Sequence, residues 1–348
     1  MAIDFETVLF LIAVALAFDF MNGFHDAANS IATVVSTRVL RPHWAVIWAA
    51  FFNFTALGVF GLAVAATIGK GIVDPRIVDH YVVFGALVGA IAWDGITWLY
   101  GIPSSSSHAD RRRGRRGRVA KGGVGTLVGN GLAKTAVAIV LSPLLGLVLG
   151  AGLMIGVSWL FARTSPLRVD RWFRRLQLVS AALYSLGHGG NDAQKTIGIV
   201  WMLLIASGLL GSSDPLPAWV VILCYSAISL GTLFGGWRIV KTMGQRITKL
   251  RPVGGFCAET GGAAMLFLAT GLGIPVSTTH TITGAIVGVG TAQNVSAVRW
   301  GIAGNIVWAW IFTIPASAFI AGLAWWLLVP IVVALVLWII PYSLRAFL

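Results

Sequence analysis

The chain has 348 residues, of which 57% are hydrophobic and 11% are charged. Soluble domains carry about 25% charged residues, so this composition excludes a soluble globular protein and is typical of a polytopic membrane protein in contact with lipid. The net charge of +13 comes mostly from loop arginines and lysines. Membrane topology explains such loop charges, and we expect no nucleic-acid partner.

The first apolar segment opens with the acidic residues Asp4 and Glu6. A secretory signal peptide opens with basic residues and ends in a small-residue cleavage site, so we expect this first helix to stay in the mature protein. Its second half carries a polar run around Asp26. Polar and charged side chains in hydrocarbon are costly, which makes this run a candidate site. Asp19 and Asp94 are further carboxylates of this kind, but they have no counterparts in the other half of the chain.

Further apolar stretches reach the roughly 20 residues that a spanning helix needs. They are residues 44–68, 135–161, 216–237 and 301–328. With the shorter segments between them, about ten to twelve membrane elements fit the chain.

Lysines and arginines gather in three loops, which the positive-inside rule places in the cytoplasm. These residues are Arg38, Arg41, Arg163, Arg168, Arg171, Arg174, Arg175, Lys241, Arg246, Lys249 and Arg251. Segments 69–80 and 208–217 have no such excess, so we expect them and the N-terminus to lie outside the cell.

This topology makes the helix with Asp26 run inward and the helix with Asp192 run outward. The segments before Gly101 and Gly273 also run in opposite directions. Such an inverted-topology repeat has its substrate site near the membrane midplane. We therefore predict an all-α membrane protein with two inverted repeats, discontinuous helices and two re-entrant hairpins. The predicted parts are a first repeat at 1–162, a cytoplasmic basic linker at 163–176 and a second repeat at 177–348. The linker is either an amphipathic helix at the membrane surface or a plain basic loop.

A phrase of glycine, proline and hydroxyl residues occurs in both halves. Residues 101–108 read Gly-Ile-Pro-Ser-Ser-Ser-Ser-His, and residues 273–280 read Gly-Ile-Pro-Val-Ser-Thr-Thr-His. Proline favours the first turn of a helix, where free N–H groups and the helix dipole attract an anion. Two hairpins entering from opposite faces would bring both hydroxyl clusters to one anion site. The alternative, hydroxyl packing between close helices, accounts less well for two matching copies.

Asp26 and Asp192 need a reason to lie beside an anion site, because a bare carboxylate repels an anion. They can hold a coupling cation or proton, or they can accept a hydrogen bond from a protonated anion. The second role favours hydrogen phosphate over sulfate. The alternative is a structural carboxylate at a helix break.

Residues 22–29 (Asn-Gly-Phe-His-Asp-Ala-Ala-Asn), 189–192 (Gly-Gly-Asn-Asp) and 275–280 (Pro-Val-Ser-Thr-Thr-His) resemble the PiT family of inorganic phosphate transporters, and the likeness covers nearly the whole chain. The resemblance implies a secondary transporter in the inner (plasma) membrane that moves phosphate with a cation. In bacterial members the cargo is commonly a neutral metal–phosphate complex moved with protons, so a divalent metal is a candidate co-substrate.

The resemblance also implies which residues contact phosphate and the coupling ion. The expected phosphate contacts are Asp26, Asn29, Ser104, Ser105, Ser106, Ser107, Asn191, Asp192, Lys195, Ser277, Thr278 and Thr279. The expected coupling-ion residues are His25, Asp26, Asp192 and Glu259. Glu259 falls where the family carries a functional glutamate, whereas the equivalent position of the first half is Leu87.

The two Asp motifs differ from each other in a way that bears on the coupling ion. When Asp26 is aligned with Asp192, His25 faces Asn191 and Asn29 faces Lys195. The Lys195 ammonium group can stand where a sodium ion would otherwise bind, and His25 titrates near neutral pH. We therefore predict proton coupling, with sodium coupling as the alternative. The other interpretation of Lys195 is a side chain that reaches interfacial water.

An arginine-rich run at 109–118 interrupts the likeness between the repeats, because the second repeat continues there as an apolar helix. Arginines at membrane depth would each cost a few kcal/mol. One interpretation is a cytoplasmic basic loop that faces lipid or nucleic acid. The other, which we favour, is a local frameshift: GCT GAT CGG CGG C encodes Ala-Asp-Arg-Arg, and a one-base shift reads Leu-Ile-Gly-Gly.

Other functions fit the sequence less well. A sulfate carrier would not need Asp26 and Asp192. An intramembrane serine hydrolase needs one activated nucleophile rather than two sets of adjacent hydroxyls, so we expect no enzyme activity and no cofactor. No phosphate-binding loop of an ATPase occurs, so ion gradients should drive transport. The expected partners are inorganic phosphate and membrane lipid, and a homodimer is compatible with the sequence.

Overall fold

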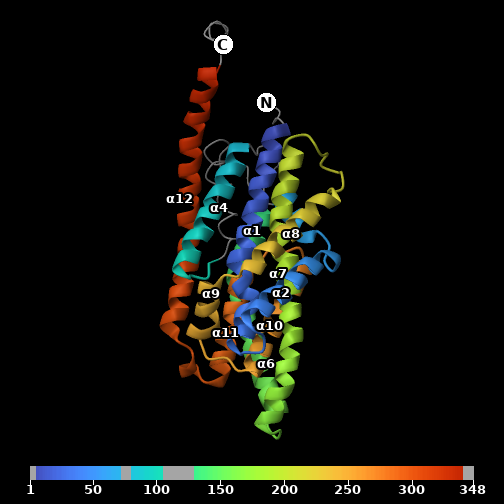
Figure 1. Cartoon of the computed structure of the whole chain (residues 1–348), viewed down its shortest axis with the longest axis vertical. Helices are drawn as coiled ribbons and strands as arrows, with labels where there is room; N and C mark the ends of the chain where they lie inside the picture. Colours follow the sequence, from blue (N-terminus) through green and yellow to red (C-terminus); the bar gives the residue numbers. More distant parts are fainter. Residues whose placement is uncertain (1–4, 72–79, 105–128, 340–348) are drawn as a thin grey trace.

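The structure, a computed structural model, describes residues 5–71, 80–104 and 129–339, and in these ranges the chain is helical with no strand (Figure 1). The helices are α1 (Phe5–Ser36), α2 (Pro42–Thr55), η1 (Ala56–Gly58), α3 (Ala63–Gly71), α4 (His80–Tyr100), α6 (Gly129–Leu160), α7 (Pro166–Ala206), α8 (Ala218–Phe234), α9 (Trp237–Lys241), η4 (Thr242–Arg246), α10 (Pro252–Gly271), α11 (Thr278–Gln293), η5 (Val295–Ala297) and α12 (Trp300–Ile339). In the described ranges, 5 helices are long and apolar enough to cross a membrane, or up to 7 if each bent pair is one span. The all-α membrane architecture is therefore confirmed.

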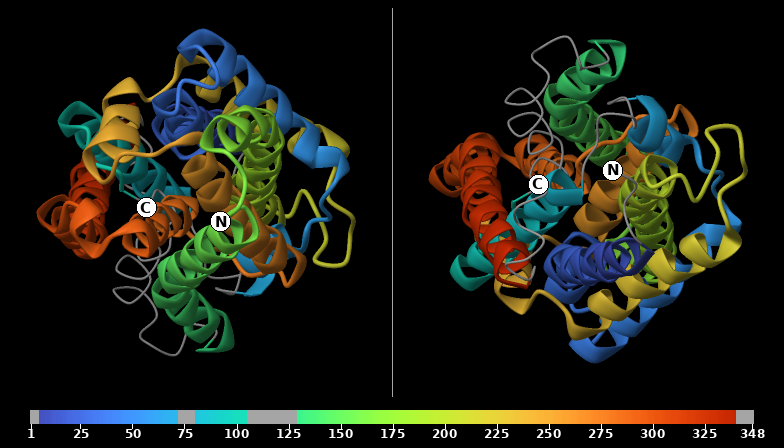
Figure 2. Two further views of the ribbon diagram at one scale, coloured as in Figure 1. Left: turned by 90° about the horizontal axis from the view of Figure 1, so that it is seen from below. Right: turned by 90° about the horizontal axis from the view of Figure 1, so that it is seen from above.

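The two halves repeat the same order of elements and interleave in space. Each half has a long helix with an Asp motif (α1 or α7), then a bent helix pair, then a helix that ends in a Gly-Ile-Pro turn (α4 or α10). The long helix of each half packs against the bent pair of the other, α1 on α8 and α9, and α7 on α2 and α3. Figure 2 looks along the bundle and shows dark-blue α1 between yellow α8 and yellow-green α7.

Two stretches that we predicted as single spanning helices are broken instead. Within 44–68, the α2–η1 segment and α3 meet at 80°, and within 216–237, α8 and α9 meet at 62°. Each break packs against the Asp motif of the other repeat. The Phe60 ring occupies the space where a Cβ on Gly190 would lie, at 2.3 Å from that position, and the His25 carbonyl lies 2.8 Å from the Cβ position of Gly236.

The Gly-Ile-Pro turn has the same conformation in both copies. Gly101 has a φ of 65° and Gly273 a φ of 66°, a left-handed geometry that favours glycine. Ile102 N donates to Thr97 O at 2.9 Å, and Ile274 N donates to Ala269 O at 2.8 Å. Both helices thus end in the same left-handed cap, which turns the chain back into the bundle.

The predicted basic linker at 163–176 is helical from Pro166 and continues without a break into the rest of α7. Its exposed side includes Leu167 and Trp172, whereas Phe173 is buried against Phe256. The segment is therefore helical and forms the first turns of the helix that carries Asp192.

Candidate functional site

The buried polar residues of both motif helices meet at the start of α11. Asp26 and Asn29 lie on α1, Asp192 lies on α7, and Thr278 and Thr279 begin α11; all five side chains are buried. Ser277 caps α11 by accepting a 3.2 Å hydrogen bond from His280 N, which directs the two threonines into the space between α1 and α7. The structure thus brings together expected site residues from both repeats.

Asp192 is bound by groups from α7 and from the second hairpin. Thr278 donates to Asp192 Oδ2 at 2.9 Å, and Lys195 donates to Asp192 Oδ1. Lys195 also donates to the Val276 carbonyl at 2.8 Å. The ammonium group therefore joins a carboxylate to a backbone carbonyl of the hairpin, and it does not extend toward interfacial water.

Asn191 holds the hairpin in place beside this carboxylate. Its side-chain amide donates to Thr270 at 3.0 Å and to the Ile274 carbonyl at 3.3 Å, and its oxygen accepts from Val276 N at 3.1 Å. Both the nitrogen and the oxygen of the side-chain amide are therefore hydrogen-bonded to the hairpin or to the helix before it. Asn191 thus orients the Gly-Ile-Pro turn, and its predicted contact with phosphate stays a prediction.

Asp26 is paired with its neighbour, His25. The His25 Nδ1 lies 2.6 Å from Asp26 Oδ1, and Nε2 lies 3.0 Å from the Thr97 hydroxyl. Thr97 donates to the Trp93 carbonyl at 2.9 Å and accepts from Ser104 at 2.9 Å. Both ring nitrogens of His25 thus have a hydrogen-bond partner, the Asp26 carboxylate on one side and the Thr97 hydroxyl on the other. The network ties Asp26 to the first residue of the serine run, and Ser105, Ser106 and Ser107 lie outside the described residues.

Asn29 joins the first motif to the second hairpin. Its amide donates to the Thr279 hydroxyl at 2.9 Å and to the Thr278 hydroxyl at 3.3 Å. Thr279 in turn lies 3.4 Å from Asp26 Oδ2. The two threonines therefore connect the carboxylates of both repeats, so a ligand that reaches them contacts both halves of the chain.

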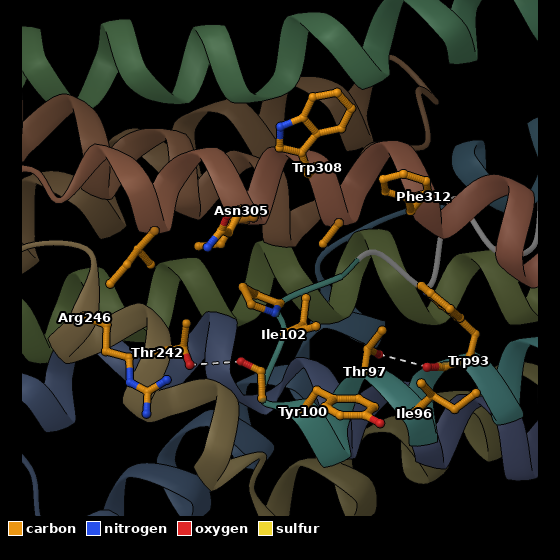
Figure 3. Close-up of a pocket in the computed structure, with 15 residues that line it drawn as sticks. Trp93, Ile96, Thr97, Tyr100, Ile102, Thr242, Arg246, Asn305, Trp308 and Phe312 are labelled. Carbon is orange, nitrogen blue, oxygen red and sulfur yellow. Dashed lines mark hydrogen bonds between the residues drawn. The ribbon is translucent and has the colours of Figure 1, made fainter.

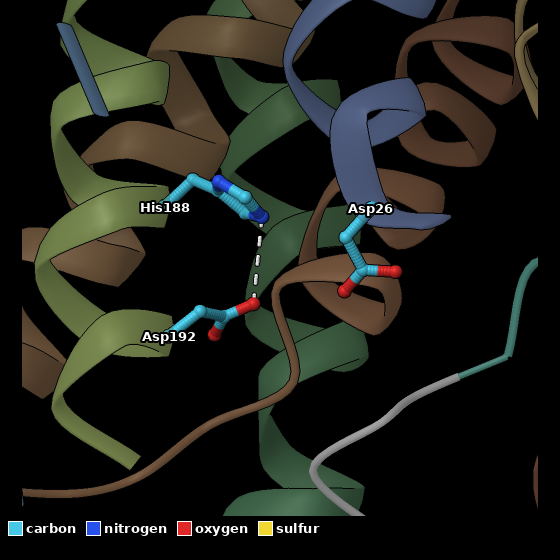
Figure 4. A group of neighbouring side chains, drawn as sticks. All are labelled: Asp26, His188 and Asp192. Carbon is cyan, nitrogen blue, oxygen red and sulfur yellow. Dashed lines mark ion pairs between the residues drawn. The ribbon is translucent and has the colours of Figure 1, made fainter. Parts of the chain in front are cut away.

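A group of possible cation ligands lies between the motif helices. One ligand atom from each of Asp26, His188 and Asp192 lies within 4.8 Å of the others (Figure 4). His188 Nε2 is 3.4 Å from Asp192 Oδ2, and His188 Nδ1 is 3.2 Å from Asn53 Oδ1. His188 is not among the residues predicted above, although its spacing of four residues from Asp192 places both on one face of α7.

Glu259 lies in a separate hydrogen-bonded pocket, with direct contacts to none of the carboxylates above. Thr33 donates to its Oε1 at 2.5 Å, Gln177 donates to the same oxygen at 3.0 Å, and Ser180 donates to Oε2. These three donors provide hydrogen bonds to both carboxylate oxygens in a fully buried position. They join α1, α7 and α10, so Glu259 holds the motif helices against the second hairpin. Its sequence counterpart, Leu87, is a buried apolar residue of α4.

Gln194 is a further residue that the sequence analysis missed. Its Oε1 accepts from the backbone N–H groups of Val64 and Ala65 at 3.0 and 3.2 Å. These groups open α3, so Gln194 caps the helix that follows the first break. Only the tertiary contact between α7 and α3 reveals this role.

A cavity of about 910 Å³ lies beside the first Gly-Ile-Pro turn, between the end of α4, η4 and α12 (Figure 3). Its walls are mostly apolar, with Thr97, Thr242, Arg246 and Asn305 as polar members. Thr242 donates to the Gly101 carbonyl at 2.9 Å. Through Thr97 the cavity borders the hydrogen-bond network of His25.

Comparisons with known proteins agree with this arrangement. The model of the phosphate transporter family matches residues 22–169 and again residues 162–321. A probable low-affinity inorganic phosphate transporter of Rhizobium meliloti (strain 1021) is 64% identical over 321 residues, covering 92% of this chain and 96% of the relative. A protein of the same description from Bacillus subtilis (strain 168) is 46% identical, and the match covers 92% of this chain and 97% of the relative. A solved structure described as the sodium-dependent phosphate transporter has a TM-score of 0.82 and 25% identity, covering 93% of this chain and 99% of that one.

Proposed function

The chain belongs to the phosphate transporter family, and we propose that it imports inorganic phosphate in symport with protons. It is a multi-pass membrane protein, and we place it in the inner (plasma) membrane with its N-terminus outside. The basic residues around Arg163 to Arg175 and around Arg246 to Arg251 support this orientation.

Proton coupling rests on one observation, the position of the Lys195 ammonium group. It bonds to a carboxylate oxygen of Asp192 and to the backbone carbonyl of Val276. Oxygens of these two kinds are the ligands that hard cations prefer. A covalently attached ammonium therefore takes the place of a free cation at this point. Because the Lys195 ammonium group already offsets one negative charge, the site needs one fewer sodium ion to bind an anion.

Phosphate recognition follows from the donors around the two threonines. The Thr278 and Thr279 hydroxyls, the Asn29 amide and the Lys195 ammonium converge between α1 and α7. Hydroxyl and ammonium groups at a capped helix start suit an oxyanion. Asp26 and Asp192 accept hydrogen bonds, and a proton on the anion would supply one. This acceptor pair favours hydrogen phosphate over sulfate.

A divalent metal fits this proposal as part of the cargo. Asp26, His188 and Asp192 supply two carboxylates and one imidazole within reach of one ion. Such an ion would screen the two carboxylates from phosphate, as in transport of a neutral metal–phosphate complex.

The test is uptake of labelled phosphate into proteoliposomes made with the full chain. We expect a proton gradient, acidic outside, to drive accumulation in sodium-free buffer, and sulfate in excess to compete poorly. Magnesium and sodium are then varied separately. Uptake that strictly requires sodium would exclude proton coupling and favour the sodium-coupled alternative. Strong competition by sulfate would contradict the proposed selectivity for hydrogen phosphate.

A further inference from the structure

Asp19 is a carboxylate for which the transport site described above has no use. It lies on α1 and is fully buried among apolar residues that include Phe18 and Tyr225. Among the described residues, no group forms a well-aligned hydrogen bond to either carboxylate oxygen. Thr196 of α7 faces it, and the Thr196 hydroxyl likewise has no well-aligned partner there.

The position of Asp19 relates it to the phosphate site. It precedes Asp26 by seven residues on the same helix, which is about two turns and about 10 Å along the axis. Residues at this spacing lie on one face of a helix. With the N-terminus outside, Asp19 is on the external side of Asp26, where a proton arriving from outside would come first.

The charged groups around Asp19 come from two helices besides its own. Asp192 and Lys195 of α7 lie within electrostatic reach of Asp19, and Cys224 and Tyr225 of α8 are its other titratable neighbours. Asp94 of α4 acts on His25 instead. Among the described residues, Lys195 is the positive charge that acts on Asp19.

Asp19 differs from the two motif carboxylates in the partners that surround it. Asp26 pairs with the imidazole of His25, and Asp192 pairs with the Lys195 ammonium and lies beside the imidazole of His188. Among the residues that the structure describes, none forms an ion pair with Asp19, and Lys195, which acts on it electrostatically, is bound to Asp192 and to Val276. A buried carboxylate without a cation is most stable when it carries a proton.

We infer that Asp19 binds the coupling proton, and that Lys195 transmits its charge state to the phosphate site by pairing with Asp192 or with Asp19. One proton from outside converts the Asp19 carboxylate to the acid, which leaves Lys195 on Asp192. When that proton leaves toward the cytoplasm, the carboxylate attracts the ammonium group, and Asp192 is freed. This inference rests on the proposed proton coupling.

The experiment compares the full chain with Asp19→Asn, an uncharged residue of nearly the same shape. Two measurements are made: accumulation of phosphate driven by a proton gradient, and exchange of labelled for unlabelled phosphate at equal concentrations without a gradient. We expect Asp19→Asn to lower gradient-driven accumulation about tenfold or more, while exchange stays within about twofold, because only the proton relay is lost. Proton uptake on phosphate binding in detergent should fall by about one per phosphate.

Two further variants make the result decisive. Asp19→Glu should restore part of the gradient-driven uptake, and Ser229→Ala, a buried polar change on α8, should leave both measurements unchanged. If Asp19→Asn proves unstable, the exchange, proton-uptake and pH-profile measurements are made on Asp19→Glu, whose pH profile should be displaced. Gradient-driven uptake by Asp19→Asn at the level of the unchanged chain would overturn the inference and leave the proposed function standing. Failure of a proton gradient to drive the unchanged chain would instead overturn the proposed coupling.

Discussion

The Thr278 hydroxyl, at the start of α11, lies 2.9 Å from Asp192 Oδ2 on α7. This bond connects the hydroxyl phrase of the second hairpin directly to the Asp motif of the same repeat. Asn29 of the first repeat donates to the same hydroxyl at 3.3 Å. Thr278 is therefore a point at which both repeats act on one potential ligand.

Replacing Thr278 with Val tests this point. The change keeps the shape but removes a hydroxyl bound to a charged group, which is worth about 1.5–3 kcal/mol. We expect the phosphate KM to rise about tenfold or more, and the thermal unfolding temperature to fall as well, because a buried Asp192 oxygen loses its donor. Thr291→Val, on the same helix, removes a hydroxyl that bonds only to its own helix at Val287 and Gly288 and serves as the control. An unchanged KM would place phosphate elsewhere.

Lys195→Ala should change the ion requirement of transport. The substitution removes the ammonium group from between Asp192 and Val276 and leaves two oxygens that can bind a free cation. We expect sodium-free uptake to fall about tenfold or more, because a buried carboxylate loses its partner, and added sodium to restore part of it. Lys249→Ala, in a predicted cytoplasmic loop, is the matched control. Loss of uptake that sodium does not relieve would argue that the ammonium group binds phosphate without replacing a cation.

Glu259→Gln should reduce stability more than phosphate affinity. Three donors surround the carboxylate, and an amide would place an N–H group against one of them. Such a mismatch costs about 1–3 kcal/mol. Thermal unfolding of the purified protein measures this loss. Asp170→Asn, in a half-exposed pair with Arg174, is the control and should change stability by less than about 1 kcal/mol. Normal stability with lost transport would make Glu259 a coupling residue.

The arginine-rich run at 109–118 lies outside the described residues. The proposed frameshift there can be tested against residues 281–290, which occupy the equivalent position in the second repeat. In the second repeat, a Cβ at Gly284 or Gly288 would lie 2.1 Å from the backbone carbonyls of Pro143 or Leu147 on α6. A helix with such close packing has no room for arginine. We expect resequencing to reveal a shifted frame, and replacement of 109–118 by the sequence of 281–290 to raise phosphate uptake. Confirmed arginine codons with full transport would refute the frameshift.

Membrane orientation can be read from single cysteines. Cys224 and Cys257 are buried, so they should react little with a membrane-impermeant maleimide. We expect Ser213→Cys, in the predicted external loop, to be labelled in intact cells, and Ser165→Cys, in the predicted cytoplasmic loop, only after permeabilisation. Both positions are exposed in the structure. The reverse pattern would invert the proposed topology.

The sequence by itself determined the class of the protein and much of the site. Composition indicated a membrane protein, and the duplicated motifs around Asp26, Asp192 and the Gly-Ile-Pro turns indicated a two-fold repeat with a shared polar centre. These features can be read locally, because buried charges are rare in hydrocarbon and a left-handed turn selects glycine.

The tertiary structure decided how these residues are connected. Two apolar stretches that look continuous in the sequence form bent helix pairs in the structure. Their breaks pack against the Asp motifs through Phe60 and Gly236. The tertiary structure also directed Lys195 to Val276, although 81 residues separate them. Long-range contacts of this kind depend on how helices pack, which composition and local spacing do not specify. For the same reason, only the packing of α1 on α7 shows that Lys195, which acts electrostatically on Asp19, is bound to Asp192 and Val276.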